Sequence, residues 1–195
     1  MKIFWFDVET TGLNPEVNDI IQLGYVFEID GKEVESGELF LKPLNFEAID
    51  ERALQVNGIT RDRLEQFPEP CIQFSKMKEI LGNHIDKYDR NDKAYVGGYN
   101  VGFDYGFLSA LARKCGDRYG FGSFLNHVQL DPLSIINVLH AHGKLPYDAP
   151  NRKLVTMCNV FGVDLEHAHD AVSDVKATRK LYYKVLEFSG LLKSE

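Results

Sequence analysis

The chain opens with a short alternating segment, residues 2–9 (KIFWFDVE), whose large apolar side chains occupy both faces of an extended strand. Successive side chains of a strand point to opposite faces. One face carries Ile3 and Trp5 and the other carries Phe4, Phe6 and Val8. A strand that is apolar on both faces is typical of the middle of a covered sheet. We therefore predict a buried central strand here.

The remaining pattern changes from strands to helices partway along the chain. Residues 19–29 and 33–42 predict two more strands, and the Asp30-Gly31 dipeptide between them is typical of a tight hairpin. Helical periodicity then appears at residues 47–56, 71–87, 103–115, 132–142, 151–161 and 171–188, with further strands at 94–98 and 127–131. Residues 116–126 and 143–151 predict loops. The order predicts a single α/β domain over residues 1–195, with a mixed five-stranded sheet and helices on both faces.

Composition agrees with one globular domain and narrows its partners. The chain has 195 residues, of which 44% are hydrophobic, and a formal net charge of -7. Such an acidic protein lacks a broad basic surface for gripping long duplex DNA. The three cysteines are far apart among apolar neighbours, which predicts reduced thiols in a reducing compartment. The N-terminus predicts neither a signal peptide nor a membrane span, so we expect a soluble cytoplasmic protein.

Two carboxylates interrupt the first strand. Asp7 and Glu9 are two residues apart, so both side chains leave the same face of the strand. Like charges at this spacing repel by roughly 4 kcal/mol at an effective dielectric of about 20. A divalent cation would turn that repulsion into attraction. The alternative interpretation is a strand end with solvated acids, which is common for a single D-x-E motif.

Further acids fall on inward helix faces. Asp104 heads the apolar stripe of the helix predicted at 103–115, and the alternative role for it is a helix cap. Asp174 shares a face with Thr178 and Leu181 in the last helix. His169 precedes Asp174 by five residues and can reach the same site only from the loop before that helix.

Together these residues predict a metal-dependent phosphodiesterase. Four carboxylates from three segments favour hard cations, Mg²⁺ or Mn²⁺, over zinc. Two such ions roughly 3.5 to 4 Å apart stabilise the attacking and leaving oxygens of an in-line displacement at phosphorus. His169 titrates near neutral pH and is a candidate general base.

The ordered motifs resemble those of the DnaQ-like 3′ to 5′ exonucleases of the DEDDh type. DVETTGL resembles the first motif, NVGFD the second, and the segment from His169 to Asp174 the third. LQVNGITRDRL and RKLVTMCNVFGV also resemble segments of the proofreading epsilon subunit of bacterial DNA polymerase III. The resemblance covers nearly the whole chain, and we expect no counterpart of the long polymerase-binding and clamp-binding tail of the epsilon subunit. It implies a ribonuclease H-like fold and two metal ions held by Asp7, Glu9, Asp104 and Asp174, with His169 as general base.

The resemblance also implies substrate contacts. Thr10 and Thr11 would lie near the terminal 3′ hydroxyl, and Leu13 would lie against the terminal base. Asn57 and Tyr99 stand where the pattern often has histidine, and Asn57 is counted among the substrate contacts. Stacking on aromatic rings contributes roughly 1 to 3 kcal/mol per base. The candidates for stacking are Phe103, Phe121 and Phe124, each of which has ordinary core packing as the alternative.

Three functional hypotheses follow. The first is a 3′ to 5′ exonuclease acting on single-stranded or frayed DNA, releasing nucleoside 5′-monophosphates, free-standing or within a polymerase assembly. The second is an exoribonuclease of the RNase T or oligoribonuclease type, which must accept the RNA 2′ hydroxyl. The third is a non-catalytic nucleic-acid-binding or polymerase-accessory module on a nuclease fold that has lost activity. Basic residues Lys144, Arg152 and Lys153 are candidates for contacting the substrate backbone, and Asp131 for a supporting or capping role.

Overall fold

The computed structural model describes residues 1–146, 149–165 and 170–192 and contains a mixed five-stranded sheet. Its strands are β1 (Lys2–Thr10), β2 (Ile20–Ile29), β3 (Lys32–Phe40), β4 (Ala94–Gly97) and β5 (Leu125–Leu130). Their order is β3-β2-β1-β4-β5. The pairs β1–β2 and β2–β3 are antiparallel, and the pairs β1–β4 and β4–β5 are parallel. The predicted sheet is thus confirmed, with β1 at its centre.

The β2–β3 hairpin turns where the sequence predicted it. Asp30 and Gly31 both have positive φ, 50° and 79°. Such angles suit the right-handed twist of a two-residue hairpin, and glycine adopts them without a steric penalty.

The helices follow the predicted order with three differences. They are η1 (Phe46–Ala48, a 3₁₀ turn), α1 (Glu51–Asn57), α2 (Arg61–Glu65), α3 (Pro70–Gly82), α4 (Val101–Lys114), α5 (Pro132–Ala141), α6 (Leu154–Phe161) and α7 (Ala171–Phe188). The single helix predicted at 47–56 is divided, because Asp50 is extended and caps the N-terminus of α1. Helix α2 was missed because five residues show too little periodicity. Helix α3 ends at Gly82, five residues earlier than predicted.

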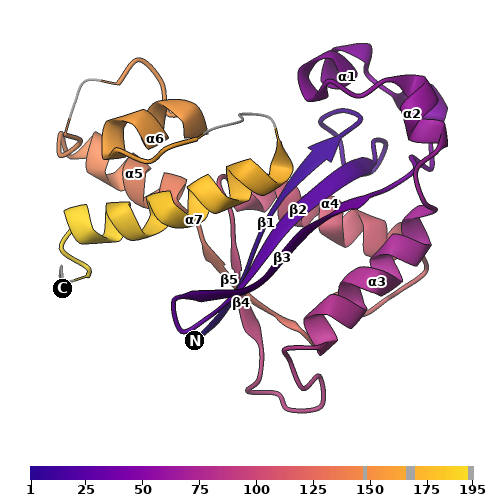
Figure 1. Ribbon diagram of the computed structural model, residues 1–195, viewed down its shortest axis with the longest axis horizontal. Coiled ribbons are helices and arrows are strands. Elements are labelled where there is room, and N and C mark those ends of the chain that lie inside the picture. The colour runs from indigo at the N-terminus through magenta and orange to yellow at the C-terminus, as the bar shows by residue number, and fades with distance from the viewer. Residues whose placement is uncertain (147–148, 166–169, 193–195) are drawn as a thin grey trace.

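Helices cover both faces of the sheet, as predicted (Figure 1). Helices α3 and α4 pack on the face that carries Phe4 and Phe6, where they contribute Met77 and Phe107 to the largest core cluster. Helix α7 crosses the other face, with α5 and α6 beside it (Figure 1). No helix in the described ranges is long and apolar enough to span a membrane.

The prediction of three reduced thiols was wrong. Cys71 in the first turn of α3 and Cys115 at the end of α4 form a disulfide, with their Cα atoms 5.4 Å apart. The two residues are 44 positions apart in the sequence, so only the packing of α3 on α4 brings them together. Cys158 is free and buried, as expected. The inference of a reducing compartment rested on those thiols and loses that basis.

Candidate active site

Strand β1 carries Asp7 and Glu9 on the face that α7 covers. Ile3 and Trp5, which precede them on that face, are fully buried. Asp7 and Glu9 are half-buried near the carboxyl end of the strand. The buried apolar half of β1 therefore holds the two acids at a fixed position on the sheet.

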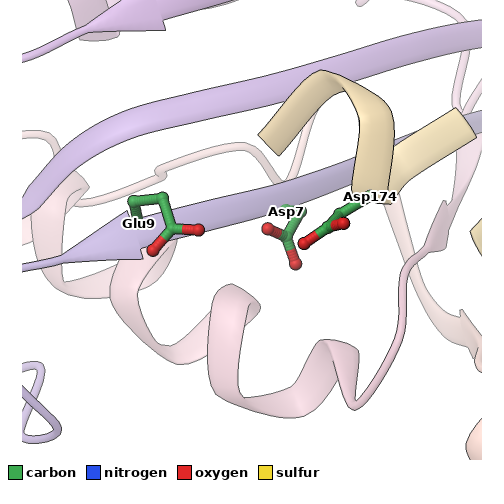
Figure 2. Close-up of side chains that lie close together, drawn as sticks. All are labelled: Asp7, Glu9 and Asp174. Atoms are coloured by element: carbon green, nitrogen blue, oxygen red, sulfur yellow. The ribbon is translucent and has the colours of Figure 1, made fainter. Parts of the chain in front are cut away.

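Helix α7 brings Asp174 to the same place. Asp170 caps the helix by accepting a hydrogen bond of 3.0 Å from the amide of Ser173. Asp174 lies in the first turn, and Thr178 and Leu181 continue its face into the core, as the periodicity predicted. Figure 2 shows Asp7 and Asp174 directed toward each other from β1 and α7, with Glu9 further along the strand. One carboxylate oxygen from each of the three residues lies within 4.8 Å of the others.

Burial and repulsion from neighbouring carboxylates raise the pKa values of Asp7 and Glu9. Burial, and then the charge of Asp174, raise the pKa of Asp7 to about 7. Burial, followed by the charges of Asp7, Asp174 and Asp170, raises the pKa of Glu9 to about 8. A cation bound among these carboxylates would favour their ionised forms and so lower the pKa values again. An all-oxygen donor set suits a hard divalent ion.

Asp104 reaches the site from the opposite face of the sheet. It lies in the first turn of α4, is 3% exposed, and accepts a 3.0 Å hydrogen bond from the amide of Val8. Burial and the charge of Asp7 raise its pKa, while the Val8 hydrogen bond acts in the opposite direction. In the described part of the chain, the tight group of ligand oxygens comprises Asp7, Glu9 and Asp174, and Asp104 stands next to it.

His169, the predicted general base, lies outside the described residues. The described chain resumes at Asp170, directly before the helix that carries Asp174.

The last residue of β1 and the loop after it hold three predicted substrate contacts. The Thr10 hydroxyl donates to the carbonyl oxygen of Gly12 at 2.7 Å. The Thr11 hydroxyl accepts from the amide of Asp19 at 2.9 Å. Leu13 is 82% exposed. The two hydroxyls thus shape the loop, and Leu13 is its most exposed large apolar side chain, ahead of Val17 at 45%.

Two other predicted contacts lie on helices. Asn57, at the end of α1, donates from Nδ2 to the carbonyl oxygen of Thr10 at 3.1 Å. Phe103, on α4 next to Asp104, is half-buried, with its ring centroid 4.9 Å from that of Phe107. Asn57 therefore ties α1 to the loop after β1, and Phe103 keeps part of its ring accessible.

The remaining candidates divide between core and surface. Phe121 and Phe124 are each 4% exposed and belong to the large core cluster, so the stacking role was wrong for them. Asp131 caps α5, accepting from the amide of Leu133 at 2.8 Å. The predicted basic group of Lys144, Arg152 and Lys153 is exposed.

Two residues that shape the site were not predicted from the sequence. Asn18 is buried and donates to the carbonyl oxygen of Ala48 at 2.7 Å, while Asp19 accepts from the amide of Asn45 at 2.8 Å. Together they fasten the loop after β1 to the segment before α1. The Asn-Asp dipeptide before β2 was the available signal, because such residues bond to nearby backbone.

Comparison with known proteins places the sequence in a family. The model of the RNase T family, described as exonuclease, matches residues 4–182. The chain belongs to this exonuclease family. The match confirms the predicted recognition and the predicted enzyme class, a 3′ to 5′ exonuclease.

Relatives of the exonuclease include much longer proteins. A DNA polymerase III of the PolC type from Bacillus cereus is 29% identical over 182 residues, which are 93% of this chain and 11% of that protein. The corresponding protein of Lacticaseibacillus paracasei is 32% identical over 178 residues, 91% of this chain and again 11% of the relative. The chain therefore spans about a tenth of the length of these curated relatives.

Solved structures of exonuclease I share the fold. The zinc-bound complex of E. coli exonuclease I with single-stranded DNA has a TM-score of 0.78 at 18% identity, over 96% of this chain and 40% of that one. The likeness confirms the predicted ribonuclease H-like fold.

Proposed function

We propose that this exonuclease hydrolyses phosphodiester bonds from the 3′ end of single-stranded or frayed DNA and releases nucleoside 5′-monophosphates. The observation that carries the proposal is the convergence of Asp7, Glu9 and Asp174, with ligand oxygens within 4.8 Å of one another. The pKa values of Asp7 and Glu9 are raised by burial and by neighbouring carboxylates, and a divalent cation held by Asp7, Glu9 and Asp174 would offset that cost.

The donor set fits Mg²⁺ or Mn²⁺. Asp7, Glu9 and Asp174 would hold the metal with Asp104 beside them, and two ions are proposed on the strength of the family resemblance. When bound, such ions stabilise the negative charge that develops on the attacking and leaving oxygens at phosphorus. His169 is proposed to accept the proton of the attacking nucleophile, a role that rests on its motif alone.

The loop after β1 is proposed to receive the terminal nucleotide. Leu13 presents an exposed apolar side chain suited to the face of a base, and Phe103 offers a second surface on α4. The hydroxyls of Thr10 and Thr11 are engaged within the loop. We therefore propose that Thr10 and Thr11 act on the 3′ hydroxyl by ordering the backbone that lies near it. Asn57 holds the same backbone in place from α1.

A DNA substrate and a polymerase context are supported by the relatives. Those named above are DNA polymerases, and the solved complex of exonuclease I contains single-stranded DNA. We propose that residues 1–195 act as one exonuclease domain in the cytoplasm, alone or beside a polymerase.

A gel time course tests the proposal. The substrates are 5′-labelled single-stranded DNA and RNA of matched sequence, each with Mg²⁺, Mn²⁺ or EDTA. The proteins are wild type, Asp174→Asn, and Asp62→Asn as a control in which an exposed acid of α2 is neutralised. A metal-dependent ladder that shortens from the 3′ end, lost only in Asp174→Asn, is expected. Faster shortening of RNA would assign the enzyme to the exoribonucleases, and shortening in EDTA would contradict the metal site.

A further inference from the structure

Helix α7 lies unusually close to β2 beside the acidic cluster. Gly24 of β2 stands directly opposite Asp7 in the antiparallel pair with β1. A Cβ atom built on Gly24 would lie 2.6 Å from the carbonyl oxygen of Ala171 and 2.7 Å from the amide nitrogen of Val172. These are backbone atoms of the first turn of α7, so no side-chain rotation can relieve the overlap. The helix can occupy its place only because residue 24 has no side chain.

The close approach concerns the same face as the catalytic acids. Residues directly opposite each other in an antiparallel pair project to the same side of the sheet. A side chain at position 24 would therefore point where Asp7 points, toward α7. Asp174 follows Val172 by two residues in the same first turn. The contact at Gly24 thus acts on the turn that sets how far Asp174 stands from Asp7.

A second contact holds α7 further along its length. Glu28 of β2 is fully buried and accepts hydrogen bonds from Arg179 and Tyr183 of α7 and from the indole of Trp5 at 3.2 Å. Arg179 lies eight residues beyond Ala171, about 12 Å along the helix axis. With one point fixed at Glu28, a displacement at Gly24 would tilt the first turn of α7 away from the sheet.

We propose that Gly24 is a positioning residue for the metal site: it lets the first turn of α7 rest on β2 and so sets the spacing between Asp174 and Asp7. This inference rests on the proposed function, because it assumes that these acids hold a metal. Glycine has no side chain that could bind the ion, so Gly24 affects metal binding only through the position of α7. To restore van der Waals distance from a new Cβ atom, the first turn must move by roughly 1 Å.

The test measures Mn²⁺ binding by isothermal titration calorimetry. Gly24→Ala should weaken binding about 10- to 100-fold, the usual effect of disturbing residues that orient metal ligands. Gly37→Ala is the matched control, because Gly37 lies on β3 and the atoms nearest to a Cβ there belong to the side chain of Tyr25, with the hydroxyl oxygen at 3.0 Å. Circular dichroism and thermal melts in EDTA establish that each variant is folded.

A compensating variant separates positioning from general damage. Asp174→Glu lengthens the ligand by one methylene group, so it should weaken Mn²⁺ binding in the wild-type background. In the Gly24→Ala background, where the helix has moved away, the same change should restore most of the lost affinity. If Asp174→Glu weakens Mn²⁺ binding in the wild type but strengthens it in Gly24→Ala, the two positions are energetically coupled. If Gly24→Ala binds Mn²⁺ as wild type does, or if Asp174→Glu fails to restore its binding, the proposal is wrong.

Two further outcomes are distinguishable. If wild type and Asp7→Asn bind Mn²⁺ equally, or neither binds it, the proposed function itself fails. If Gly24→Ala does not fold, Glu28→Gln takes its place, since glutamine still accepts from Trp5 but lacks the charge that holds Arg179. A folded Glu28→Gln protein should bind Mn²⁺ more weakly than wild type by at least about threefold, and equal affinity would overturn the proposal.

Discussion

Asp104 accepts a hydrogen bond from the amide of Val8, the residue that separates Asp7 from Glu9 on β1. The helix on one face of the sheet is thus joined to the strand whose acids face the other. Through this bond, one oxygen of Asp104 stabilises the fold. The negative charge of Asp104 adds to the electrostatic repulsion at Asp7.

This double role predicts different effects for two substitutions of Asp104. Asparagine keeps an oxygen for the Val8 amide but loses the negative charge, so Asp104→Asn should fold normally and lower the exonuclease rate at least about 100-fold. Alanine leaves the buried amide without its partner, so Asp104→Ala should also lose about 1 to 3 kcal/mol of unfolding free energy. Urea unfolding and initial rates on single-stranded DNA measure the two effects. Equal unfolding free energies for the two variants would show that the hydrogen bond has no structural role.

The pKa values of Asp7 and Glu9 predict how stability depends on pH without metal. Both are raised, to about 7 and about 8, above the values near 3.9 and 4.3 of an unfolded chain. Between these limits the folded protein binds more protons than the unfolded one, so the unfolding free energy should fall as pH rises from about 4 to about 8. These two groups should therefore make the melting temperature in EDTA higher at pH 5 than at pH 8.

Neutralising one acid should remove much of that slope. Asp7→Asn relieves repulsion of about 1 to 2 kcal/mol at pH 8, which corresponds to a rise of roughly 2 to 8 °C in melting temperature for a chain of this size. Added Mn²⁺ should reverse the trend in wild type, because metal binding requires deprotonated ligands and stabilises only the folded state. The control is Asp62→Asn, which should melt as wild type does at both pH values. A melting temperature in EDTA that rises steadily from pH 5 to pH 8 in wild type, with no effect of Asp7→Asn, would contradict the repulsive cluster.

The acidic site was predictable because its residues obey strong periodicities. The two-residue repeat of β1 placed Asp7 and Glu9 on one face, and the helical repeat of α7 turned Asp174 inward. Asp104 was assigned to the core face of α4 in the same way, and its burial bears this out. Regular elements determine side-chain direction, so they were sufficient for this part of the site.

What could not be predicted depends on contacts between distant segments. The Cys71–Cys115 disulfide requires α3 to pack on α4, and the close approach at Gly24 requires α7 to cross β2. Phe121 and Phe124 lie in a glycine-rich segment whose packing partners come from elsewhere, so loop composition suggested exposure where there is burial. Local pattern contains no information on which remote segment covers a loop.

The disulfide predicts a stability that depends on reductant while catalysis does not. A crosslink across 44 residues stabilises by up to about 4 kcal/mol through the unfolded chain, and measured gains are usually about 2 to 4 kcal/mol. Dithiothreitol, or Cys71→Ser with Cys115→Ser, should lower the melting temperature by roughly 5 to 15 °C. The initial rate at 25 °C should stay within about twofold, because the bond joins α3 to the C-terminal end of α4, whereas Asp104 lies in the first turn of α4.

Alkylation checks the starting state of the protein. The unreduced, denatured protein should take up label at Cys158 alone, and the reduced protein at all three cysteines. Label at three cysteines before reduction would show that the thiols are reduced in the purified protein. In that case reductant should leave the melting temperature unchanged.

Leu13 offers a test of the substrate site that is independent of the metal. Its side chain, near the start of the loop between β1 and β2, is 82% exposed, so folding gains little from it. Leu13→Ala should leave the unfolding free energy within about 0.5 kcal/mol of wild type, as exposed substitutions usually do. If the leucine lies against the terminal base, its removal should raise KM for single-stranded DNA about 5- to 10-fold, a loss of roughly 1 to 1.4 kcal/mol of binding. Ile72→Ala, which truncates a 64% exposed residue on α3, is the matched control and should change neither quantity. If Leu13→Ala and Ile72→Ala have the same KM as wild type, the base lies elsewhere, and the half-buried ring of Phe103 becomes the next position to test.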